Sequence, residues 1–293
     1  MLGLWACLGW GLALPLTAQV RCQVRDTEGS PIGYVRVLDT QGRYGFLADS
    51  LGWFTLPRQL EATDSLVCSA IGYASATVSV AALRAQPVVR LSEHAITLAT
   101  AQIVGSRGKV ATQGRERTSG VVSFVYQLEP RREALPEDLL VGGPVADTFG
   151  IDTSGYRGGE FGIPLRVDGP TWLRSVQVYF LQNTFDTLRF RLHVYAQTPE
   201  GPGADLLPRE VRFDVTDQLE GWQTFDFQHL GFEVAADCLV TLEILEHTSA
   251  HPTPLLTIPG TVSVGSSSWV KRRVGAGWRH LRVVPSFYVE LYQ

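Results

Sequence analysis

This sequence has few charged side chains, no excess of basic ones and no paired cysteine motif. Each of these shortages argues against a class of function. Charged side chains make up 18% of the 293 residues, below the ~25% that is usual for globular proteins. The 25 Lys and Arg do not outnumber the 29 Asp and Glu, so the composition gives no sign of nucleic-acid binding. The four cysteines include no Cys-x-x-Cys pair, which argues against a zinc or redox motif.

The short motifs of common catalytic sites are missing as well. The sequence has neither His-Glu-x-x-His nor His-x-x-Glu, so it lacks the zinc site of a carboxypeptidase. It also has no Gly-x-Ser-x-Gly elbow, phosphate-binding loop or dinucleotide fingerprint. We therefore predict no catalytic residue, no cofactor and no enzymatic activity. A hydrolase whose site the sequence hides stays open, and carboxylates with shifted pKa values gathered in one cleft would favour it.

Residues 1–18 are typical of a secretory signal peptide. Residues 2–16 carry no charged side chain, and the small residues Thr17 and Ala18 follow. The apolar run is short and contains Pro15, which disfavours a spanning helix. No later stretch approaches the ~18 apolar residues of a membrane helix. We expect cleavage after Ala18, and a mature chain without a transmembrane span that is periplasmic, outer-membrane-associated or extracellular.

Three cysteines remain after this cleavage, namely Cys22, Cys68 and Cys238. An odd number leaves at least one thiol unpaired in an exported protein. Cys22 and Cys68 could form a disulfide if their strands adjoin. All three could equally be small buried side chains, and the sequence leaves both interpretations open.

Residues 19–105 alternate short apolar segments with turn residues, which is the pattern of a small all-β unit. Val20, Cys22 and Val24 alternate with polar neighbours, as in a half-buried strand. Turn chemistry recurs in residues 26–31 and 49–52, and Gly29, Gly52 and Gly72 suit turn positions that need a positive φ or a close backbone approach. About seven or eight strands, among them residues 77–80 and 98–104, without a long amphipathic helix predict a Greek-key sandwich.

A set of residues in this unit matches the order and spacing of a known family pattern. The set consists of Val24, Asp26, Gly29, Pro31, Ile32, Val37, Asp49, Gly52, Phe54, Leu56, Asp64, Leu66, Ser69, Ile71, Gly72, Tyr73, Leu83, Val89 and Leu91. It resembles the carboxypeptidase-regulatory-like module, and the resemblance covers most of residues 20–91. Cys22 and Ala48 depart from the family pattern, which has Gly and Thr there.

The resemblance implies a transthyretin-like sandwich of about seven strands that has no catalytic activity of its own. Such modules occur beside carboxypeptidase domains and at the start of TonB-linked outer-membrane receptors. They also occur in exported bacterial proteins of uncharacterised function. The family pattern does not define a ligand site in this chain.

Residues 106–120 and 121–293 differ sharply in composition. Residues 106–120 are rich in Gly and charged side chains and predict a linker. Residues 121–293 return to alternating strands, as in Phe190-Arg191-Leu192-His193-Val194-Tyr195. About eight such strands predict a second, jelly-roll-like β-sandwich. Gly159-Glu160-Phe161-Gly162 and Ser266-Ser267-Ser268-Trp269 are similar to the region that follows the regulatory-like module in those exported proteins.

Two groups of side chains in residues 121–293 could bind a ligand. Asp147, Asp152 and Glu160 accompany a Gly-rich stretch and could hold a structural calcium ion, or simply face water. Aromatic side chains could line one concave sheet and stack against sugar rings, or pack in the core. These are Trp172, Tyr195, Trp222, Trp269 and Trp278, with Tyr179 beside them in the sequence pattern.

The leading hypothesis is a non-enzymatic exported protein that binds or scaffolds at the bacterial cell envelope. Its partner would be a glycan or another envelope protein, and docking to a transport receptor stays open. The first alternative is a glycan-binding accessory protein that uses the aromatic residues of 121–293. The second alternative is the hidden hydrolase.

Overall fold

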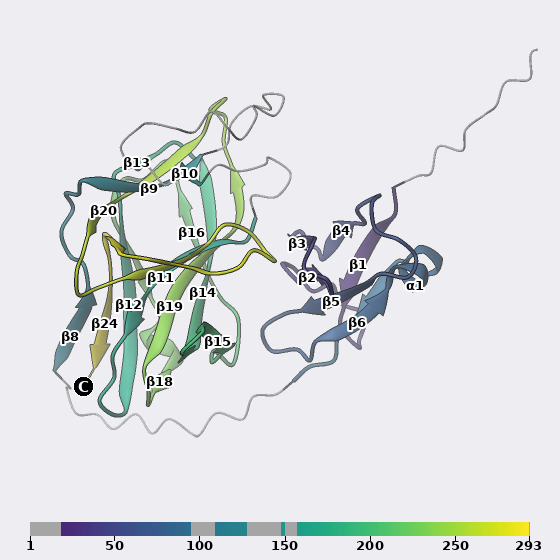
Figure 1. The fold of residues 1–293 in the computed structure, drawn as a ribbon, viewed down its shortest axis with the longest axis horizontal. Helices are drawn as coiled ribbons and strands as arrows, with labels where there is room; N and C mark the ends of the chain where they lie inside the picture. The colour runs from purple at the N-terminus through teal and green to yellow at the C-terminus, as the bar shows by residue number, and fades with distance from the viewer. Residues whose placement is uncertain (1–18, 95–108, 128–147, 150–156, 293) are drawn as a thin grey trace, which may run out of the picture.

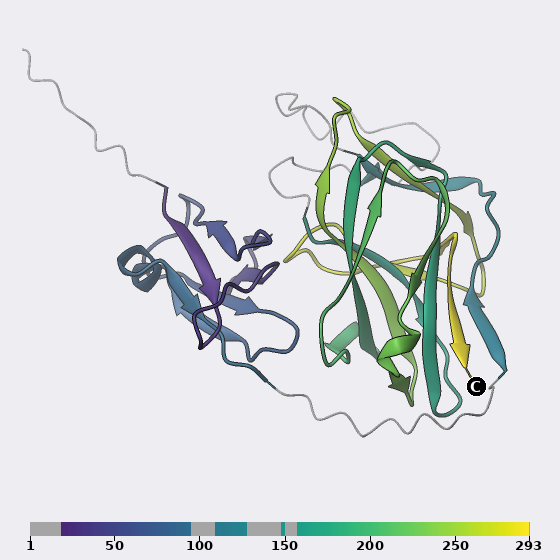
Figure 2. The same ribbon diagram turned by 180° about the vertical axis from the view of Figure 1, so that it is seen from behind.

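The computed structural model describes residues 19–94, 109–127, 148–149 and 157–292. Within these residues nearly all of the regular secondary structure is β-strand, which confirms the predicted all-β class. The strands gather in two bodies that lie side by side in both views (Figures 1 and 2). We call residues 19–94 the first module, and the described residues from 109 onward the second module.

Seven strands and one short helix form the first module. They are β1 (Arg21–Arg25), β2 (Arg36–Asp39), β3 (Gly45–Leu47), β4 (Trp53–Thr55), β5 (Ser65–Ser69), β6 (Ala76–Ser79), α1 (Val80–Ala85) and β7 (Val88–Arg90). One sheet has the order β4-β1-β7, and the other has the order β3-β2-β5-β6. Buried side chains of both sheets, such as Val24 and Leu66, share one core. The module is sandwich-like, whereas its Greek-key order stays a prediction.

Turn chemistry in the first module follows the sequence. Gly29, Gly52 and Gly72 have φ values of 94°, 74° and 83°, so the predicted positive φ is confirmed at all three. The strand expected over residues 77–80 instead ends at Ser79, whose Oγ accepts a hydrogen bond from Ala82 N at 3.2 Å. This N-cap starts α1. The strand expected over residues 98–104 lies outside the described residues.

The second module contains the remaining strands and one 3-10 helix. They are β8 (Val110–Gly114), β9 (Val122–Gln127), β10 (Thr148–Phe149), β11 (Gly159–Leu165), β12 (Thr171–Phe180), β13 (Gln182–Asn183), β14 (Thr187–Thr198), β15 (Gly201–Asp205), β16 (Val211–Thr216), β17 (Gly221–Asp226), η2 (Gln228–Leu230), β18 (Glu233–Val234), β19 (Cys238–Thr248), β20 (Leu255–Val262), β21 (Ser268–Lys271), β22 (Arg279–Leu281), β23 (Val283–Pro285) and β24 (Phe287–Tyr292).

Two large sheets pack against each other in this module. One has the order β15-β14-β19-β11-β21-β22, and the other has the order β17-β12-β24-β8. Alternate residues such as Phe190, Val240 and Val289 point into a shared apolar core. A further sheet, β10-β9-β20-β13, extends the core at one end. The arrangement is sandwich-like, and the jelly-roll order stays a prediction.

The predicted linker contains a strand. Val110–Gly114 form β8, which pairs antiparallel with β24 from Gly114↔Tyr288 to Val110↔Tyr292. Five residues of the segment predicted as a linker are therefore strand, while the boundaries of the modules stay a prediction. β8 lies at the edge of its sheet, and exposed residues alternate with half-buried ones along it.

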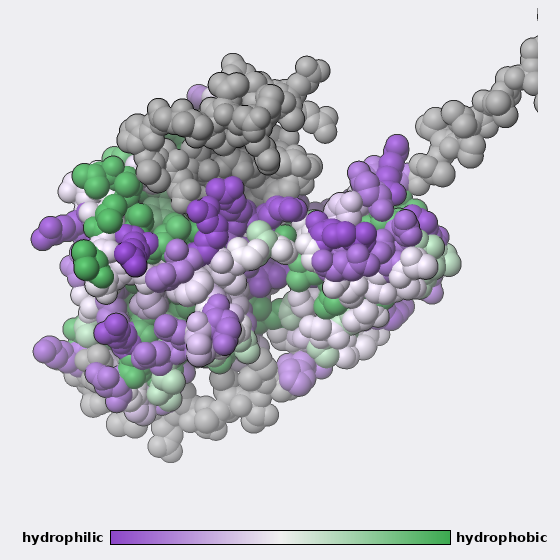
Figure 3. All heavy atoms as spheres, viewed as in Figure 1, coloured by the Kyte–Doolittle hydropathy of each residue, from purple (hydrophilic) through white to green (hydrophobic). Residues whose placement is uncertain are grey.

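The two modules are in contact in the space-filling view (Figure 3), and a small apolar cluster lies where they touch. Tyr34 and Leu47 of the first module pack with Leu245 and Val274 of the second. The modules are thus joined by packing as well as by the polar contacts described next.

None of the helices that the structure describes has the length and apolar character needed to span a bilayer.

Candidate functional site

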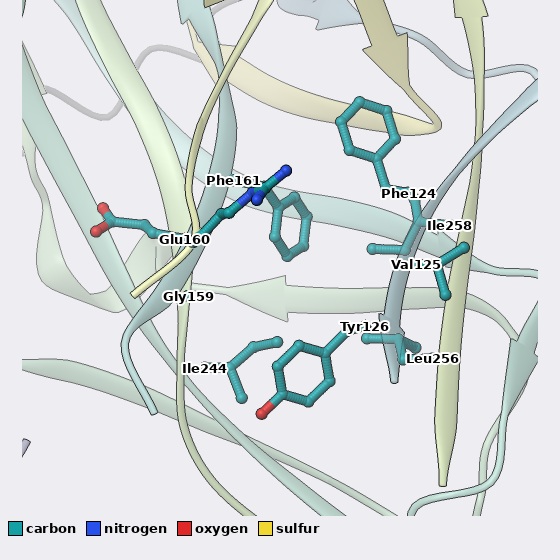
Figure 4. Close-up of a pocket in the computed structure, with 10 residues that line it drawn as sticks. Phe124, Val125, Tyr126, Gly159, Glu160, Phe161, Ile244, Leu256 and Ile258 are labelled. Carbon is teal, nitrogen blue, oxygen red and sulfur yellow. The ribbon is translucent and has the colours of Figure 1, made fainter. Parts of the chain in front are cut away.

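Four charged side chains form one row across the outer face of the sheet β14-β19-β11-β21. The register pairs Arg191 with Glu243, and Glu243 with Glu160. Glu160 pairs in turn with Lys271. All four side chains are buried. Figure 4 shows the Glu160 carboxylate directed away from the aromatic rings of the core, while its neighbour Phe161 points toward them.

Arg36, from β2 of the first module, inserts into this row. Its Nη2 donates to Oε2 of Glu160 at 3.0 Å, and its Nε donates to Oε1 of Glu243 at 3.2 Å. The hydroxyl of Tyr195 accepts from Nη1 at 3.1 Å. Like charges on directly opposite residues of paired strands repel, so the guanidinium neutralises a repulsion that the register creates. The Arg36 side chain keeps 21% of its surface exposed.

Burial and neighbouring charges shift the pKa values of Glu160 and Glu243 in opposite directions. Burial alone would raise the pKa of Glu160, but neighbouring cations, led by Lys271, lower it to about 2. Burial likewise opposes the ionised form of Glu243, yet Arg191 and Arg36 hold its pKa well below the ordinary value. Burial lowers the pKa of Lys271. Both carboxylates are therefore ionised at neutral and mildly acidic pH.

A histidine–aspartate pair lies beside the row. Nδ1 of His193 lies 2.5 Å from Oδ2 of Asp205, and Nε2 lies 2.8 Å from Oε2 of Glu243. The ring of Tyr195 stacks on the imidazole with centroids 5.2 Å apart. Burial raises the pKa of Tyr195 well above its ordinary value, so the phenol stays protonated. Contacts on three sides fix the orientation of the His193 ring.

The ligand atoms of Glu160, His193 and Glu243 lie within 4.8 Å of one another. This spacing and this mixture of nitrogen and oxygen atoms would suit a metal ion. The guanidinium of Arg36 lies among the same atoms, with Nη2 3.0 Å from Nε2 of His193. The place of a cation is therefore taken by a side chain of the first module.

Tyr34 makes a second polar contact between the modules. Its hydroxyl donates to Oε2 of Glu246 at 2.6 Å and accepts from Nη1 of Arg189 at 2.7 Å. Its carbonyl oxygen accepts from Nη1 of Arg191 at 3.1 Å. Tyr34 has a φ of 54°, a left-handed conformation that is uncommon for a bulky residue. The contacts with the second module hold this strained residue in place.

A cleft of about 310 Å³ opens between the modules above the row. The second module contributes Arg191, His193, Asp205 and Leu207, and the first module contributes Arg36, Ser69, Ala70, Ile71, Gly72, Tyr73, Ser75 and His94. The turn that ends β5 therefore forms one wall. The other wall and the floor come from β14, β15 and the segment after β15.

One buried donor in this cleft lacks a hydrogen bond. Arg191 lines the cleft, and its Nη2 has no acceptor in hydrogen-bond geometry within the described part of the chain. Nη2 does lie 2.6 Å from Oε2 of Glu243, but that oxygen is off the direction of its N–H bonds. The guanidinium is therefore paired in charge but incompletely hydrogen-bonded, which is costly for a buried group.

A second cavity lies inside the second module. Figure 4 shows it between β9, β20 and β11, with Phe124, Tyr126 and Phe161 among its lining residues. Its volume of about 20 Å³ is enough for one water molecule. As it stands, this mostly apolar hollow has no room for more than that one molecule.

The structure does not bring the five predicted sugar-stacking residues together. Trp172 and Trp222 lie on β12 and β17 of one sheet. Tyr195 and Trp269 lie on β14 and β21 of the opposite sheet, and Trp278 packs edge-on against Tyr195 with centroids 5.7 Å apart. Tyr195 is buried. A single platform made of these five side chains is therefore not present.

A different aromatic cluster does lie on the outer face of β12, β17 and β24. Trp222 contacts Tyr179 and Tyr288 edge-on, with centroids 5.4 Å and 5.0 Å apart. The hydroxyl of Tyr288 donates to Oε1 of Gln177 at 2.6 Å. The three rings are only partly buried.

Of the predicted calcium ligands, Asp147 and Asp152 lie outside the described residues. Glu160 is described, and it already has two cationic partners, Lys271 and Arg36. The hydroxyl of Thr241 also donates to its Oε1 at 2.5 Å. The role that the structure gives Glu160 is therefore in the charged row.

Sequence reasoning missed Arg36, Arg191, His193 and Glu243. Alternation of polar and apolar residues indicates a strand whose polar side faces solvent. The available signal was the presence of charged residues on one face of both long strands, residues 189–195 and 239–246. A face with that much charge can also be covered by another module, and the sequence alone does not reveal the cover.

No protein-family model matches the chain, and no curated protein matches it either. What the structure defines by itself is an all-β protein with sandwich-like sheets and a charged cleft between two modules. The carboxypeptidase-regulatory-like assignment stays a prediction from the motif residues of the first module.

Proposed function

We propose that this chain is a non-enzymatic exported binding protein of the bacterial cell envelope that holds a small ligand in the cleft between its modules. The observation that carries the proposal is the shared lining. Arg36 comes from the first module, whereas Arg191, His193 and Asp205 come from the second. A concave site of about 310 Å³ with a few fixed polar groups has the size and character of a small-molecule pocket.

The state of the carboxylates favours binding over hydrolysis. The gathering of Glu160 and Glu243 in one place is the feature that would favour a hydrolase. Their pKa values are lowered, however, and a general acid needs a raised one. Both side chains are also buried beneath Arg36. Their arrangement suits a fixed scaffold for the cleft better than proton transfer to a substrate.

Filling the cleft tests this proposal. Ser75 is exposed at the cleft wall, so Ser75→Trp should block the cleft without disturbing the core. The mature chain would be screened against small polar compounds by thermal shift, and every hit would be measured again with the variant. The matched control is Gln182→Trp, which changes an exposed residue of β13. Binding by the control but not by Ser75→Trp supports the proposal, and equal binding by both variants contradicts it.

Export is the second part of the proposal, and the apolar residues 2–16 support it. Fractionation of a bacterium that expresses the full chain should place the product, shortened after Ala18, outside the cytoplasm. An uncleaved product in the cytoplasm would contradict this part alone.

Glycan binding on the aromatic cluster is a second candidate function. Tyr179, Trp222 and Tyr288 are partly exposed and adjacent, and aromatic rings stack against the apolar faces of sugars. A glycan array probed with the wild type and with Trp222→Ala tests it. Loss of a signal in the variant supports this function, whereas an array without a binder or an unchanged variant counts against it.

A further inference from the structure

We infer that the cleft takes an uncharged, hydroxyl-rich ligand of the saccharide class. This inference rests on the proposed function and specifies its ligand. It starts from the charge balance of the cleft floor. Of the charged side chains, Arg36, Arg191 and Asp205 line the cleft itself. Behind this lining the buried Glu160 and Glu243 pair with Arg36, Glu243 also pairs with Arg191, and Glu160 also pairs with Lys271. Three cations and three carboxylates therefore stand together, and Glu210, which pairs with Arg191, has a further cation, Arg212, 3.4 Å away.

Balanced charge makes a charged ligand unfavourable here. An anion attracted by Arg191 would approach Glu243 and Asp205, which lie on the same side of the sheet. A cation attracted by Asp205 would approach Arg36, whose guanidinium already occupies the position between the carboxylates. Either ion would have to break an existing pair, and leaving a buried charge unpaired is strongly unfavourable. A neutral ligand avoids that loss.

The polar groups of the cleft suit hydroxyl partners. Nη2 of Arg191 is a buried donor without a hydrogen bond, although it pairs in charge with Glu243. Asp205 accepts from the backbone N–H groups of Val194 and Leu207 and lies beside Nδ1 of His193, and because its side chain keeps 19% of its surface exposed, a ligand hydroxyl can donate to it as well. Ser69 and Ser75 on the facing wall can both donate and accept. Hydroxyl groups satisfy all of these at once, because each one is a donor and an acceptor.

The rest of the wall suits a ring with an apolar face. Ala70, Ile71 and Leu207 place apolar groups in the cleft. The partly buried ring of Tyr73 lies beside them, and burial together with Glu93 raises the pKa of its hydroxyl. A protonated phenol next to apolar side chains offers a stacking surface with a polar edge. The volume of about 310 Å³ limits the ligand to a small molecule.

Calorimetric titration of the mature chain with matched sugars tests the inference. The neutral probes are glucose, galactose and N-acetylglucosamine, and the charged probes are glucuronate, protonated glucosamine and inorganic phosphate. At least one neutral probe should bind about tenfold more tightly than its charged counterpart. Ser75→Ala together with His94→Ala should weaken that binding by about tenfold. Gln182→Trp, at an exposed residue that does not line the cleft, should leave it unchanged.

The outcomes separate this inference from the proposed function. Tighter binding of glucuronate, glucosamine or phosphate than of any neutral probe overturns the saccharide assignment, while loss of that binding in Ser75→Trp still supports a cleft that binds ligands. Absence of binding by every neutral probe also overturns the inference. Saccharide binding that Trp222→Ala abolishes and Ser75→Trp retains overturns both proposals for the cleft and favours the aromatic cluster.

Discussion

Nη2 of Arg36, in the first module, lies 3.0 Å from Oε2 of Glu160 in the second. The contact crosses the boundary between two sets of sheets that share no strand among the described residues. Glu160 and Glu243 are directly opposite each other in the ladder of β11 and β19, and their repulsion needs a cation. The residues that join the modules therefore also shape the floor of the cleft.

Removing Arg36 should be strongly destabilising. In Arg36→Met, Glu160 and Glu243 stay buried with one cation fewer between them, and breaking a buried pair costs about 3–5 kcal/mol. Urea unfolding of the second module, followed by tryptophan fluorescence, measures the loss. The control is Arg21→Met, whose Arg21–Asp49 pair is exposed and 3.6 Å long, so little change is expected. Equal stability of both variants would mean that the carboxylates reach water without Arg36.

Acid should weaken the fold in a defined range of pH. Glu160 has an ordinary pKa of 4.5 that the folded state lowers to about 2. The unfolded chain therefore binds this proton more readily, and the stabilising contribution is complete above pH 4.5 and is lost as pH falls toward 2. Glu160→Gln cannot titrate, so its free energy of unfolding should change less with pH in this range. An identical pH dependence in wild type and variant would show that folding leaves the pKa of Glu160 unchanged.

A separate decline at milder pH should come from His247. Burial, with a smaller contribution from Arg157, lowers the pKa of its imidazole from 6.5 to about 4. The folded state thus keeps His247 neutral, and stability present above pH 6.5 should fall as pH drops toward 4. The loss should be on the order of 1–2 kcal/mol, because the site is only partly buried. His247→Phe should flatten the slope, and His280→Phe, at an exposed histidine, should not.

More of the fold than of the candidate site could be predicted from the sequence. Alternation and turn chemistry are local, so the all-β class and the turn at Gly52 followed from the residues themselves. A Cβ on Gly52 would lie 2.6 Å from the carbonyl oxygen of Val24, which explains why only glycine fits. The start of α1 was missed because one serine cap outweighed the β propensity of Val78 and Val80.

The candidate site depends on pairings between distant segments, which the sequence does not encode locally. Arg36 reaches Glu160 across 124 positions, and no pattern within either segment identifies the other. The aromatic residues show the same limit. Trp222 and Trp269 look alike in the sequence, but they lie on opposite sheets. Only the order of strands in the folded chain decides which aromatic side chains can act together.

The three thiols that the structure describes should be unreactive in the folded state. Cys22, Cys68 and Cys238 are free and fully buried. Burial raises their pKa values to about 11, 12 and 12 respectively, so almost no thiolate forms at neutral pH. A chromogenic disulfide reagent should label none of them until urea is added, and then should label all three. Ser75→Cys, at an exposed position, provides a rapidly labelled control. Labelling of a single thiol in unfolded, unreduced protein would instead indicate a disulfide.

Close packing at Gly45 makes the junction between the modules sensitive to a single methyl group. A Cβ on Gly45 would overlap the carbonyl oxygen of Val274, which is backbone and cannot turn aside. Gly45→Ala should therefore push β3 away from the second module and weaken the neighbouring contact between Arg36 and Glu160. We expect a loss of about 1–3 kcal/mol, typical of overpacking, and a larger radius of gyration by small-angle X-ray scattering.

The matched control for this prediction is Gly169→Ala, because a Cβ there meets no atom within 4 Å. It should leave both the radius of gyration and the free energy of unfolding unchanged. If Gly45→Ala behaved like Gly169→Ala, the modules would be free to shift without loss, and a cleft fixed by their contact could not be maintained. An expanded Gly45→Ala that also loses every ligand blocked by Ser75→Trp would tie the binding site to the junction itself.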